Sequence, residues 1–277
     1  MKVFVATYSD FIKFNKKPNE DFYLVSKKFP LFAIADGVTQ ACFPTGEYAF
    51  PLGARAAAEI FCYTVMRYLE KRLKEKMNYK GLIEIAFNLA NKRIEELNKN
   101  EGMTERLDYL FYDYFDTVGV VGFIAKNKLY YGYVGDCGLA IFNKNNKIIF
   151  KTNDDVAKAV NLAKKIYKKW GSFSLEQKSL ILHSQFRNRK DGRGYGSFTG
   201  EKVVKRYYRI GRKSLNEGDL ILFYSDGFLN YLSFPKFLKL IKKMDRKNFE
   251  KFTNRKAKEN YEKYGTDRTI IAFEFGS

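Results

Sequence analysis

The sequence predicts an α+β fold for this chain of 277 residues. Short apolar runs rich in β-branched and aromatic residues, typical of strands, occur near both ends of the chain and in its middle. Long amphipathic patterns, typical of helices, separate these groups of strands. The resulting order is strands, helices, strands, helices and a last strand. This order favours an α+β protein over the strict strand-helix alternation of a parallel sheet.

The first strands are predicted at 3–9, 22–26 and 31–35, where Lys, Pro and Asn break the apolar runs. From residue 53 to 76 the apolar residues recur at helical spacing and end in a lysine-rich turn, which suits the helix dipole. The stretch 81–100 repeats that pattern and stops before a glycine. We therefore expect two amphipathic helices after the first strands.

A second group of strands is predicted between residues 117 and 151, with hairpin turns at Asn127 and at 143–146. We interpret this group as a β-meander of antiparallel neighbours. The remaining elements are a strand at 219–225, helices at 234–244 and 248–264, and a closing strand at 269–275.

The segment at about 154–213 differs from both patterns. It contains a helical stretch at 156–170 and then the glycine-rich, basic run FRNRKDGRGYGSFTG at 186–200. We interpret it as a flap inserted into one domain that spans residues 1–277, because a hydrophobic fraction of 45% suffices for one large core.

Composition limits the function classes. No run of eighteen apolar residues and no signal-peptide core is present, so we expect a cytoplasmic protein without a membrane span. Three widely spaced cysteines, Cys42, Cys62 and Cys137, suggest neither a zinc site nor a disulfide framework. His183 is the only histidine, and no GxSxG motif surrounds a serine, which argues against zinc sites with two imidazoles and against a serine triad.

The net charge of +19 attracts nucleic acid, anionic lipid, or acidic and phosphorylated substrates. Charge alone does not choose among these partners. The lysines are spread through helices and loops, whereas a nucleic-acid reader more often concentrates its cations on one element. A solvated basic surface is therefore favoured over nucleic-acid binding, which the charge does not exclude.

Acidic residues occur at the boundaries of the predicted strands. Three apolar runs lead into Asp36, Asp136 and Asp226, and Asp267 directly precedes the last strand. One Asp-Gly pair is a common turn signal, but several converging carboxylates would repel one another unless cations neutralised them. Oxygen ligands select hard cations, so the pattern predicts Mg²⁺ or Mn²⁺ ahead of Zn²⁺.

At these residues the sequence resembles the metal-dependent Ser/Thr protein phosphatases of the type 2C (PPM) family. The resemblance runs in order along nearly the whole chain. The matching motifs are Asn19-Glu20-Asp21, Asp36-Gly37, Asp116-Thr117-Val118-Gly119, Val134-Gly135-Asp136, Ser225-Asp226-Gly227 and Asp267-Arg268-Thr269. It implies a four-layer αββα sandwich, in which two antiparallel sheets lie between pairs of helices and a binuclear metal site lies at one end of the sheets.

The resemblance also implies roles for single residues. Asp36 would bridge two metals, the Gly37 carbonyl would bind one of them, and Asp226 and Asp267 would complete the other. A hydroxide held between two cations is a strong nucleophile at neutral pH and could hydrolyse a phosphate ester directly.

Three further acidic residues of the resemblance lie outside that central set. Glu20 and Asp21 would bind metal or its waters, and Asp136 would belong to a possible third metal site beside the flap.

The sequence departs from the family at three places. Residues 38–40 replace the histidine that follows Asp-Gly in some members, so the proton donor to the leaving group has no candidate. Lys16 stands where many bacterial members have a phosphate-binding arginine, and Arg268 replaces the usual final asparagine. The expected catalytic residues are thus Asp36, Asp226 and Lys16.

The resemblance implies a phosphorylated protein or peptide as the substrate, and a small phosphomonoester remains open. Two alternatives also remain: a catalytically weak module that binds phosphopeptides, and a basic nucleic-acid-binding protein. Steep loss of affinity with added salt, with or without metal, would identify the second alternative.

Overall fold

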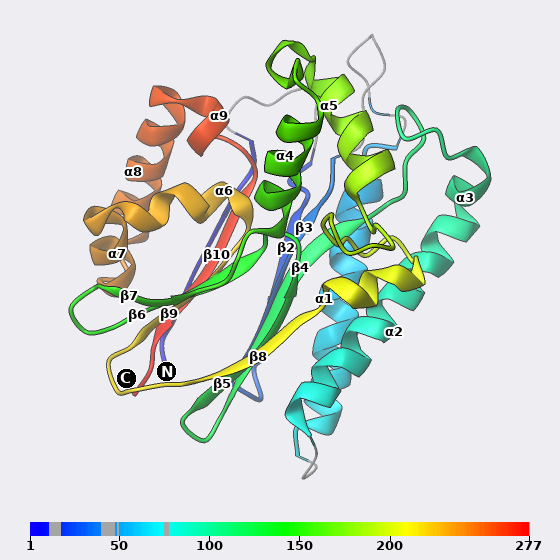
Figure 1. Cartoon of the computed structure of the whole chain (residues 1–277). Helices are drawn as coiled ribbons and strands as arrows, with labels where there is room; N and C mark the ends of the chain where they lie inside the picture. Colours follow the sequence, from blue (N-terminus) through cyan, green and yellow to red (C-terminus); the bar gives the residue numbers. More distant parts are fainter. Residues whose placement is uncertain (11–17, 40–47, 49, 75–77, 277) are drawn as a thin grey trace.

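The computed structural model describes residues 1–10, 18–39, 48, 50–74 and 78–276. Two antiparallel sheets of five strands face each other, and helices cover their outer faces (Figure 1). This arrangement confirms the predicted α+β class and the four layers of helices, sheet, sheet and helices.

One sheet has the strand order β2-β3-β4-β5-β8. Its strands are β2 (Asp21–Val25), β3 (Leu31–Gly37), β4 (Thr117–Ala125), β5 (Lys128–Val134) and β8 (Arg209–Ser214). The other sheet has the order β1-β10-β9-β6-β7. Its strands are β1 (Val3–Tyr8), β10 (Arg268–Glu274), β9 (Leu220–Tyr224), β6 (Gly138–Phe142) and β7 (Ile148–Lys151).

The helices fall into three groups. The first sheet is covered by α1 (Gly53–Arg72) and α2 (Tyr79–Asn100), which the short α3 (Met103–Arg106) follows. The second is covered by helices that follow β9: α6 (Asp226–Leu229), η4 (Asn230–Ser233), α7 (Pro235–Lys242), α8 (Arg246–Glu259) and α9 (Tyr261–Tyr264). Between β7 and β8 lie α4 (Asp155–Ile166), η1 (Trp170–Ser172), α5 (Leu175–Ile181), η2 (Leu182–Phe186) and η3 (Lys202–Tyr207).

The alternation of side chains in β3 explains the layers. Leu31, Ala33 and Ala35 pack against the α1–α2 side, while Phe32 and Ile34 point into the space between the sheets. All five side chains are buried, as a strand covered on both faces requires. The strand therefore reads as a continuous apolar run, which is why the sequence revealed it.

The segment from residue 152 to 208, here called the β7–β8 segment, packs around a small core of its own. Ala159, Ala163, Trp170, Phe186 and Tyr195 are buried in that core. Asp154 caps the N-terminus of helix α4, where its side chain accepts a hydrogen bond from the Ala157 amide at 2.7 Å.

The β-meander predicted between residues 117 and 151 is wrong. β4 pairs with β5, and β6 pairs with β7, but β5 and β6 lie in different sheets. Between them Gly135 adopts a φ of +81°, where a Cβ would lie 2.3 Å from Val118. The chain crosses from one sheet to the other at this glycine.

Two further predictions differ from the structure. The predicted helix 248–264 is divided, because Asn260 is extended (φ −156°) and its side chain starts α9 by accepting a hydrogen bond from the Lys263 amide. The strand β8 and the helix α5 lie within the segment predicted as largely irregular. Across the described residues, no helix is long and apolar enough to span a membrane.

Candidate metal centre

The acidic residues of the first sheet meet where β2 begins and β3 ends. Asp21 lies directly opposite Asp36 in the antiparallel register of these strands. On the other side of β3, Thr117 lies opposite Gly37, and its hydroxyl donates a hydrogen bond to the Asp36 carbonyl at 2.6 Å. The backbone register therefore fixes two carboxylates side by side at one end of the sheet.

The second sheet contributes the residues that follow β9. The Ser225 hydroxyl donates a hydrogen bond to Asp21 Oδ2 at 2.7 Å and accepts one from the Thr269 amide at 2.9 Å. The next residue, Asp226, begins α6, and its carboxyl group is hydrogen-bonded to that of Asp36. Ser225 and Asp226 thus join the acidic residues of the two sheets.

Asp267 and Glu20 lie at the edge of this cluster. The Asp267 oxygens accept hydrogen bonds from the backbone amides of Asp10, at 2.7 Å, and of Glu20, at 3.0 Å. The Glu20 carboxylate accepts a hydrogen bond from the Thr39 hydroxyl at 2.6 Å. Both carboxylates are buried, and these bonds fix their positions beside Asp21.

The cluster resists ionisation. Burial raises the pKa of Asp21 to about 7, assisted by the charges of Asp267 and Asp226 and opposed by the Ser225 hydrogen bond. Burial, followed by repulsion from Asp21 and Asp226, raises the pKa of Asp36 well above its usual range. Burial also raises the pKa of Asp226, opposed by its hydrogen bond to Asp36 and assisted by repulsion from Asp154.

Asp136, in the turn between β5 and β6, belongs to the same electrostatic group. Burial raises its pKa, and repulsion from Asp226 and Asp154 adds to the effect. Asp154 was not among the site residues predicted from the sequence. Its position directly before an amphipathic helix was recognisable as an N-cap signal, but its distance from Asp226 depends on the packing of the β7–β8 segment.

The donor atoms suit a hard divalent cation. Asp21 Oδ1 is buried without a hydrogen-bond partner, and an orphaned carboxylate oxygen beside other carboxylates is costly unless a cation neutralises it. Among the described residues, however, no group of three or more Asp, Glu, His or Cys side chains has the geometry of a preformed metal site. The residues therefore fit a cation by chemistry and proximity rather than as a closed cage.

Gly37 is required by the approach of α1. A Cβ at this position would lie 2.4 Å from the backbone oxygen of Ala54. On the same helix, Arg55 donates hydrogen bonds to the backbone carbonyls of Asn19, at 2.9 Å, and Asp21. The start of α1 therefore supports both acidic strands from behind, a function that the sequence did not reveal.

A second buried cluster anchors the β7–β8 segment near this end. The Arg187 guanidinium binds Asp113 through both of its terminal nitrogens, at 2.5 and 3.0 Å, and reaches Asp116 at 3.4 Å. The Ser197 hydroxyl donates a hydrogen bond to Asp116 at 2.6 Å. His183 Nδ1 lies 2.7 Å from Asp113, so the single histidine belongs to this anchor.

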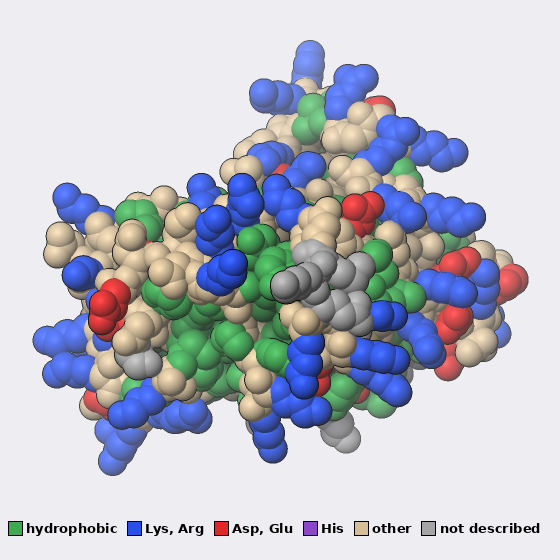
Figure 2. All heavy atoms as spheres, turned by 90° about the horizontal axis from the view of Figure 1, so that it is seen from below, with side chains coloured by type: hydrophobic (Ala, Val, Ile, Leu, Met, Phe, Trp, Pro, Cys, Tyr) green, Lys and Arg blue, Asp and Glu red, His purple; other side chains and the backbone are tan. Residues whose placement is uncertain are grey.

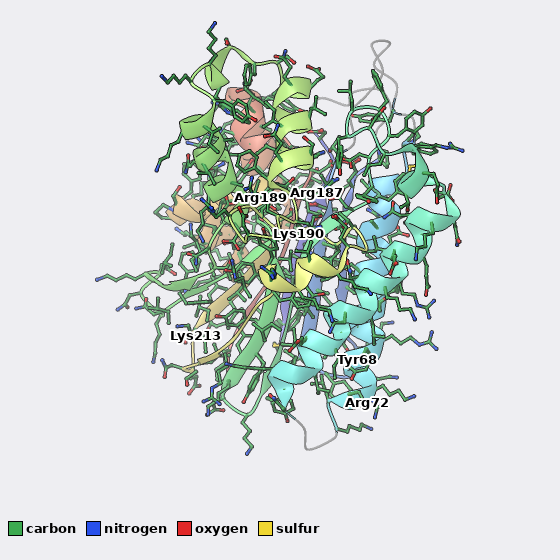
Figure 3. All side chains as sticks on the ribbon, turned by 45° about the vertical axis from the view of Figure 1, so that its right-hand side comes forward. Tyr68, Arg72, Arg187, Arg189, Lys190 and Lys213 are labelled. Carbon is green, nitrogen blue, oxygen red and sulfur yellow. The ribbon has the colours of Figure 1, made fainter. Side chains whose placement is uncertain are left out.

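The charges of this anchor are strongly coupled. Burial opposes the ionisation of Asp113, but Arg187 and His183 outweigh it and hold its pKa below the usual range. Burial raises the pKa of Asp116 to about 6, against the attraction of Arg187. Arg187, Arg189 and Lys190 lie close together in Figure 3, and the exposed Lys190 next to the anchor remains available to an anion.

Other residues singled out in the sequence have structural positions. Lys16 and Cys42 lie outside the described residues. Arg268 is buried, donates to the Thr266 carbonyl at 3.0 Å and lies over the ring of Tyr8. Cys62 and Cys137 are buried free thiols.

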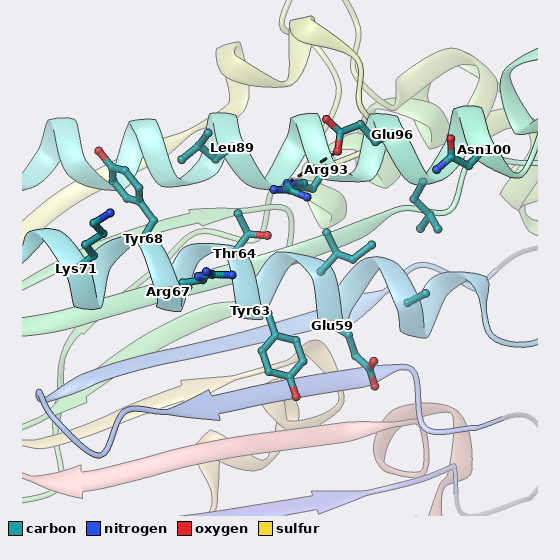
Figure 4. A pocket seen from close by; sticks show the side chains of 13 residues that line it. Glu59, Tyr63, Thr64, Arg67, Tyr68, Lys71, Leu89, Arg93, Glu96 and Asn100 are labelled. Carbon is teal, nitrogen blue, oxygen red and sulfur yellow. Dashed lines mark ion pairs between the residues drawn. The ribbon is translucent and has the colours of Figure 1, made fainter.

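A groove of about 790 Å³ lies between the outer faces of α1 and α2 (Figure 4). Its lining includes Tyr63, Arg67, Tyr68 and Arg93. None of the candidate carboxylates lines it, so we do not assign the chemistry to this groove.

The sandwich and the acidic cluster across its two sheets define a phosphatase of the metal-dependent class. The protein phosphatase 2C family matches residues 14–261. The chain belongs to this family and is a metal-dependent Ser/Thr phosphatase.

Solved structures share the fold at low sequence identity. The serine/threonine phosphatase PstP of Mycobacterium tuberculosis has a TM-score of 0.62 and 15% identity, covering 98% of this chain and 97% of that one. The catalytic domain of PstP in complex with two manganese ions has a TM-score of 0.60 and 16% identity, covering 98% and 96%. The serine/threonine phosphatase of S. agalactiae has a TM-score of 0.62 and 18% identity, covering 98% and 97%. No curated protein matches the sequence.

Proposed function

We propose that this phosphatase hydrolyses phosphoserine and phosphothreonine esters of proteins or peptides at the cluster around Asp21, Asp36 and Asp226. The observation that carries the proposal is the meeting of these carboxylates across the two sheets, with one Asp21 oxygen buried and unpartnered. Their raised pKa values support the proposal, because buried carboxylates that repel one another ionise more readily when a cation lies beside them.

We assign the metal-holding role to residues that the chain brings to this end of the sandwich. Asp36 and the Gly37 carbonyl would hold one Mn²⁺ or Mg²⁺, and Asp36, Asp226 and Asp267 the other, with Glu20 and Asp21 binding metal or its waters. Asp136, with Asp154 near it, is the candidate for a third ion. The PstP complex with two manganese ions supports two ions as the basic requirement. Such ions, when bound, activate water and neutralise the phosphoryl oxygens.

The chain itself positions this chemistry. Thr117 fixes the end of β3 through the Asp36 carbonyl, and Ser225 holds Asp21 against the second sheet. These bonds fix the carboxylates before substrate arrives, so little reorganisation is needed during the reaction. Lys16 is proposed to bind a non-bridging phosphate oxygen by one charge-assisted hydrogen bond.

The region 154–213 is proposed to act as a flap on the single domain 1–277. Its anchor at Arg187 and Asp113, shortly before the cationic run 189–193, supports this proposal. Arg189 is paired with Asp191 at 2.6 Å, whereas Lys190 is exposed and can meet an acidic or phosphorylated chain.

We also propose a cytoplasmic location. Cys62 and Cys137 are both buried free thiols, and burial raises the pKa of each thiol, so neither is reactive. A reducing compartment suits such a chain.

Hydrolysis of an aryl phosphate and of a phosphopeptide, with Mn²⁺ or with a chelator, tests the proposal. We expect chelation to abolish both activities, and Asp36→Asn and Asp226→Asn to lose at least about a hundredfold in kcat while remaining folded. Asp219→Asn is the matched control, because Asp219 is buried at the other end of the sandwich. Full activity without metal, or near wild-type turnover of either site variant, would refute the assignment.

The two alternatives predict different results. A weak phosphopeptide-binding module would bind the peptide without Mn²⁺-dependent turnover. A nucleic-acid-binding protein would bind RNA with a steep salt dependence that the chelator leaves unchanged.

A further inference from the structure

The end of the sandwich opposite the acidic cluster forms a distinct surface. Near the cluster lie the last residues of β3 and β9 and the first residues of β2, β4 and β10. The opposite ends of these five strands therefore lie together at the other end of the sandwich (Figure 1). The connections 26–30, 126–127, 143–147 and 215–219 lie there, with the first and last described residues. We call this surface the basal face.

The basal face is strongly cationic. The exposed cations of its connections and of the chain start are all lysines: Lys2, Lys27, Lys28, Lys126, Lys144 and Lys147. The connections carry two acidic residues, Glu217 and Asp219, and Asp219 is buried with its carboxylate bound to the Asn216 amide at 2.9 Å. Lys27 and Lys28 have no ion-pair partner in the described part of the chain, so their charge is available to a ligand.

The centre of the same face is apolar. Between the two sheets a hollow of about 490 Å³ opens, and its lining combines Met1, Phe29 and Phe275 with Lys27 and Lys28. A second hollow, of about 230 Å³, is lined by Lys2, Phe4, Lys242 and Met244, among others. Figure 2 shows hydrophobic side chains gathered in the middle of this view, with Lys and Arg side chains around them.

Two side chains make this apolar centre accessible. Met1 is 54% exposed and Met244 is 37% exposed, although both border the interior of the sandwich. Apolar side chains therefore reach the solvent at the rims of both hollows. An apolar surface within a ring of cations marks a binding surface rather than ordinary solvent-facing surface.

We propose that the basal face binds the surface of an anionic lipid bilayer. The lysines would lie at the negatively charged headgroups, which attract basic residues, while Met1 and Met244 enter the interfacial region. Stable peripheral binding needs two signals, and this face supplies both a cationic ring and an apolar centre.

Lipid fits this face better than nucleic acid. Nucleic acid would match the cations but would leave the apolar hollows without a partner. Its readers usually combine Arg with exposed aromatic rings for stacking, whereas the exposed cations of these connections are lysines and the rings of Phe29 and Phe275 are half-buried. In the bound state the acidic cluster would face away from the bilayer, toward phosphorylated proteins in solution.

Vesicle sedimentation tests this inference without any use of catalysis. The purified protein is mixed with vesicles of neutral phosphatidylcholine, or with vesicles that also contain phosphatidylserine, and the bound fraction is measured. We expect binding only to the anionic vesicles. Lys27→Glu/Lys28→Glu should lower the partition coefficient at least about tenfold, because two favourable charges are reversed.

The control is Lys92→Glu/Lys251→Glu, which changes the net charge equally on exposed positions of α2 and α8. It should retain binding, and both double variants should keep aryl-phosphate activity. Met244→Asn tests the apolar part, since asparagine tolerates the φ of +55° at this position, and it should weaken binding several-fold.

Equal losses in the two double variants would show attraction by net charge alone and would overturn the inference. Absence of binding to anionic vesicles, or equal binding to neutral ones, would also overturn it. Binding of RNA or polyglutamate through Lys27 and Lys28 in the absence of vesicle binding would identify a different occupant.

Discussion

Replacing Asp21 by Asn should stabilise the metal-free protein at alkaline pH. Asp21 is buried, one of its oxygens lacks a partner, and its pKa in the fold is raised from 3.8 to about 7. A carboxyl group whose pKa is higher in the folded than in the unfolded state makes the fold more stable at low pH than at high pH. That contribution is complete below about pH 4 and is lost as the pH rises to about 7.

The magnitude follows from the shift. A change of the pKa from 3.8 to about 7 corresponds to a cost of about 4 kcal/mol for ionised Asp21 at pH 8. The amide in Asp21→Asn carries no charge, so this cost disappears, while a weaker bond to Ser225 returns about 1 kcal/mol. We expect a net gain of about 3 kcal/mol at pH 8 and no gain near pH 4.

Urea unfolding in the presence of a chelator, at pH 4.5, 6 and 8, measures this gain. The control Asp219→Asn replaces a buried carboxyl group outside the cluster and should show no increasing gain with pH. Adding Mn²⁺ at pH 8 should stabilise the wild type and largely fail to stabilise Asp21→Asn. A variant less stable than the wild type at every pH would refute the electrostatic reasoning.

Three further predictions concern the surroundings of the cluster. Arg187→Met leaves Asp113 buried without its cation and should cost about 3 kcal/mol or more in urea unfolding. Gly37→Ala places a methyl group 2.4 Å from a backbone oxygen of α1, so calorimetry should show weaker Mn²⁺ binding and a lower Tm. Lys16→Ala should lower kcat/KM roughly tenfold to a hundredfold while Lys17→Ala changes little. Small, equal effects at both lysines would mean that Lys16 is surface charge.

The sequence was most informative where local pattern decides structure. The apolar run before Asp36 identified β3 because both faces of that strand are buried, and the position of Asp36 at its end followed directly. Asp226 and Asp267 were recognisable for the same reason. Their proximity could be expected only through the resemblance to a family.

The features that the sequence did not reveal depend on contacts between distant residues. Ser225 reaches Asp21 only because the two sheets stack face to face, and Arg187 meets Asp113 only because the β7–β8 segment folds back. The change of sheet at Gly135 was missed because a hairpin and a crossover begin with the same short-range signal. Periodicity carries no information about which sheet a strand joins.

The hydrogen bond between Ser225 and Asp21 makes the acidic cluster part of the seam between the two sheets. Neither sheet holds enough of the carboxylates alone, since β2 and β3 supply Asp21 and Asp36 while Asp226 and Asp267 flank β9 and β10. A newly synthesised chain therefore lacks a complete site until β10 has left the ribosome and both sheets have docked. With the proposed site, we expect no activity during synthesis, so that turnover measures the fraction of molecules that have finished folding.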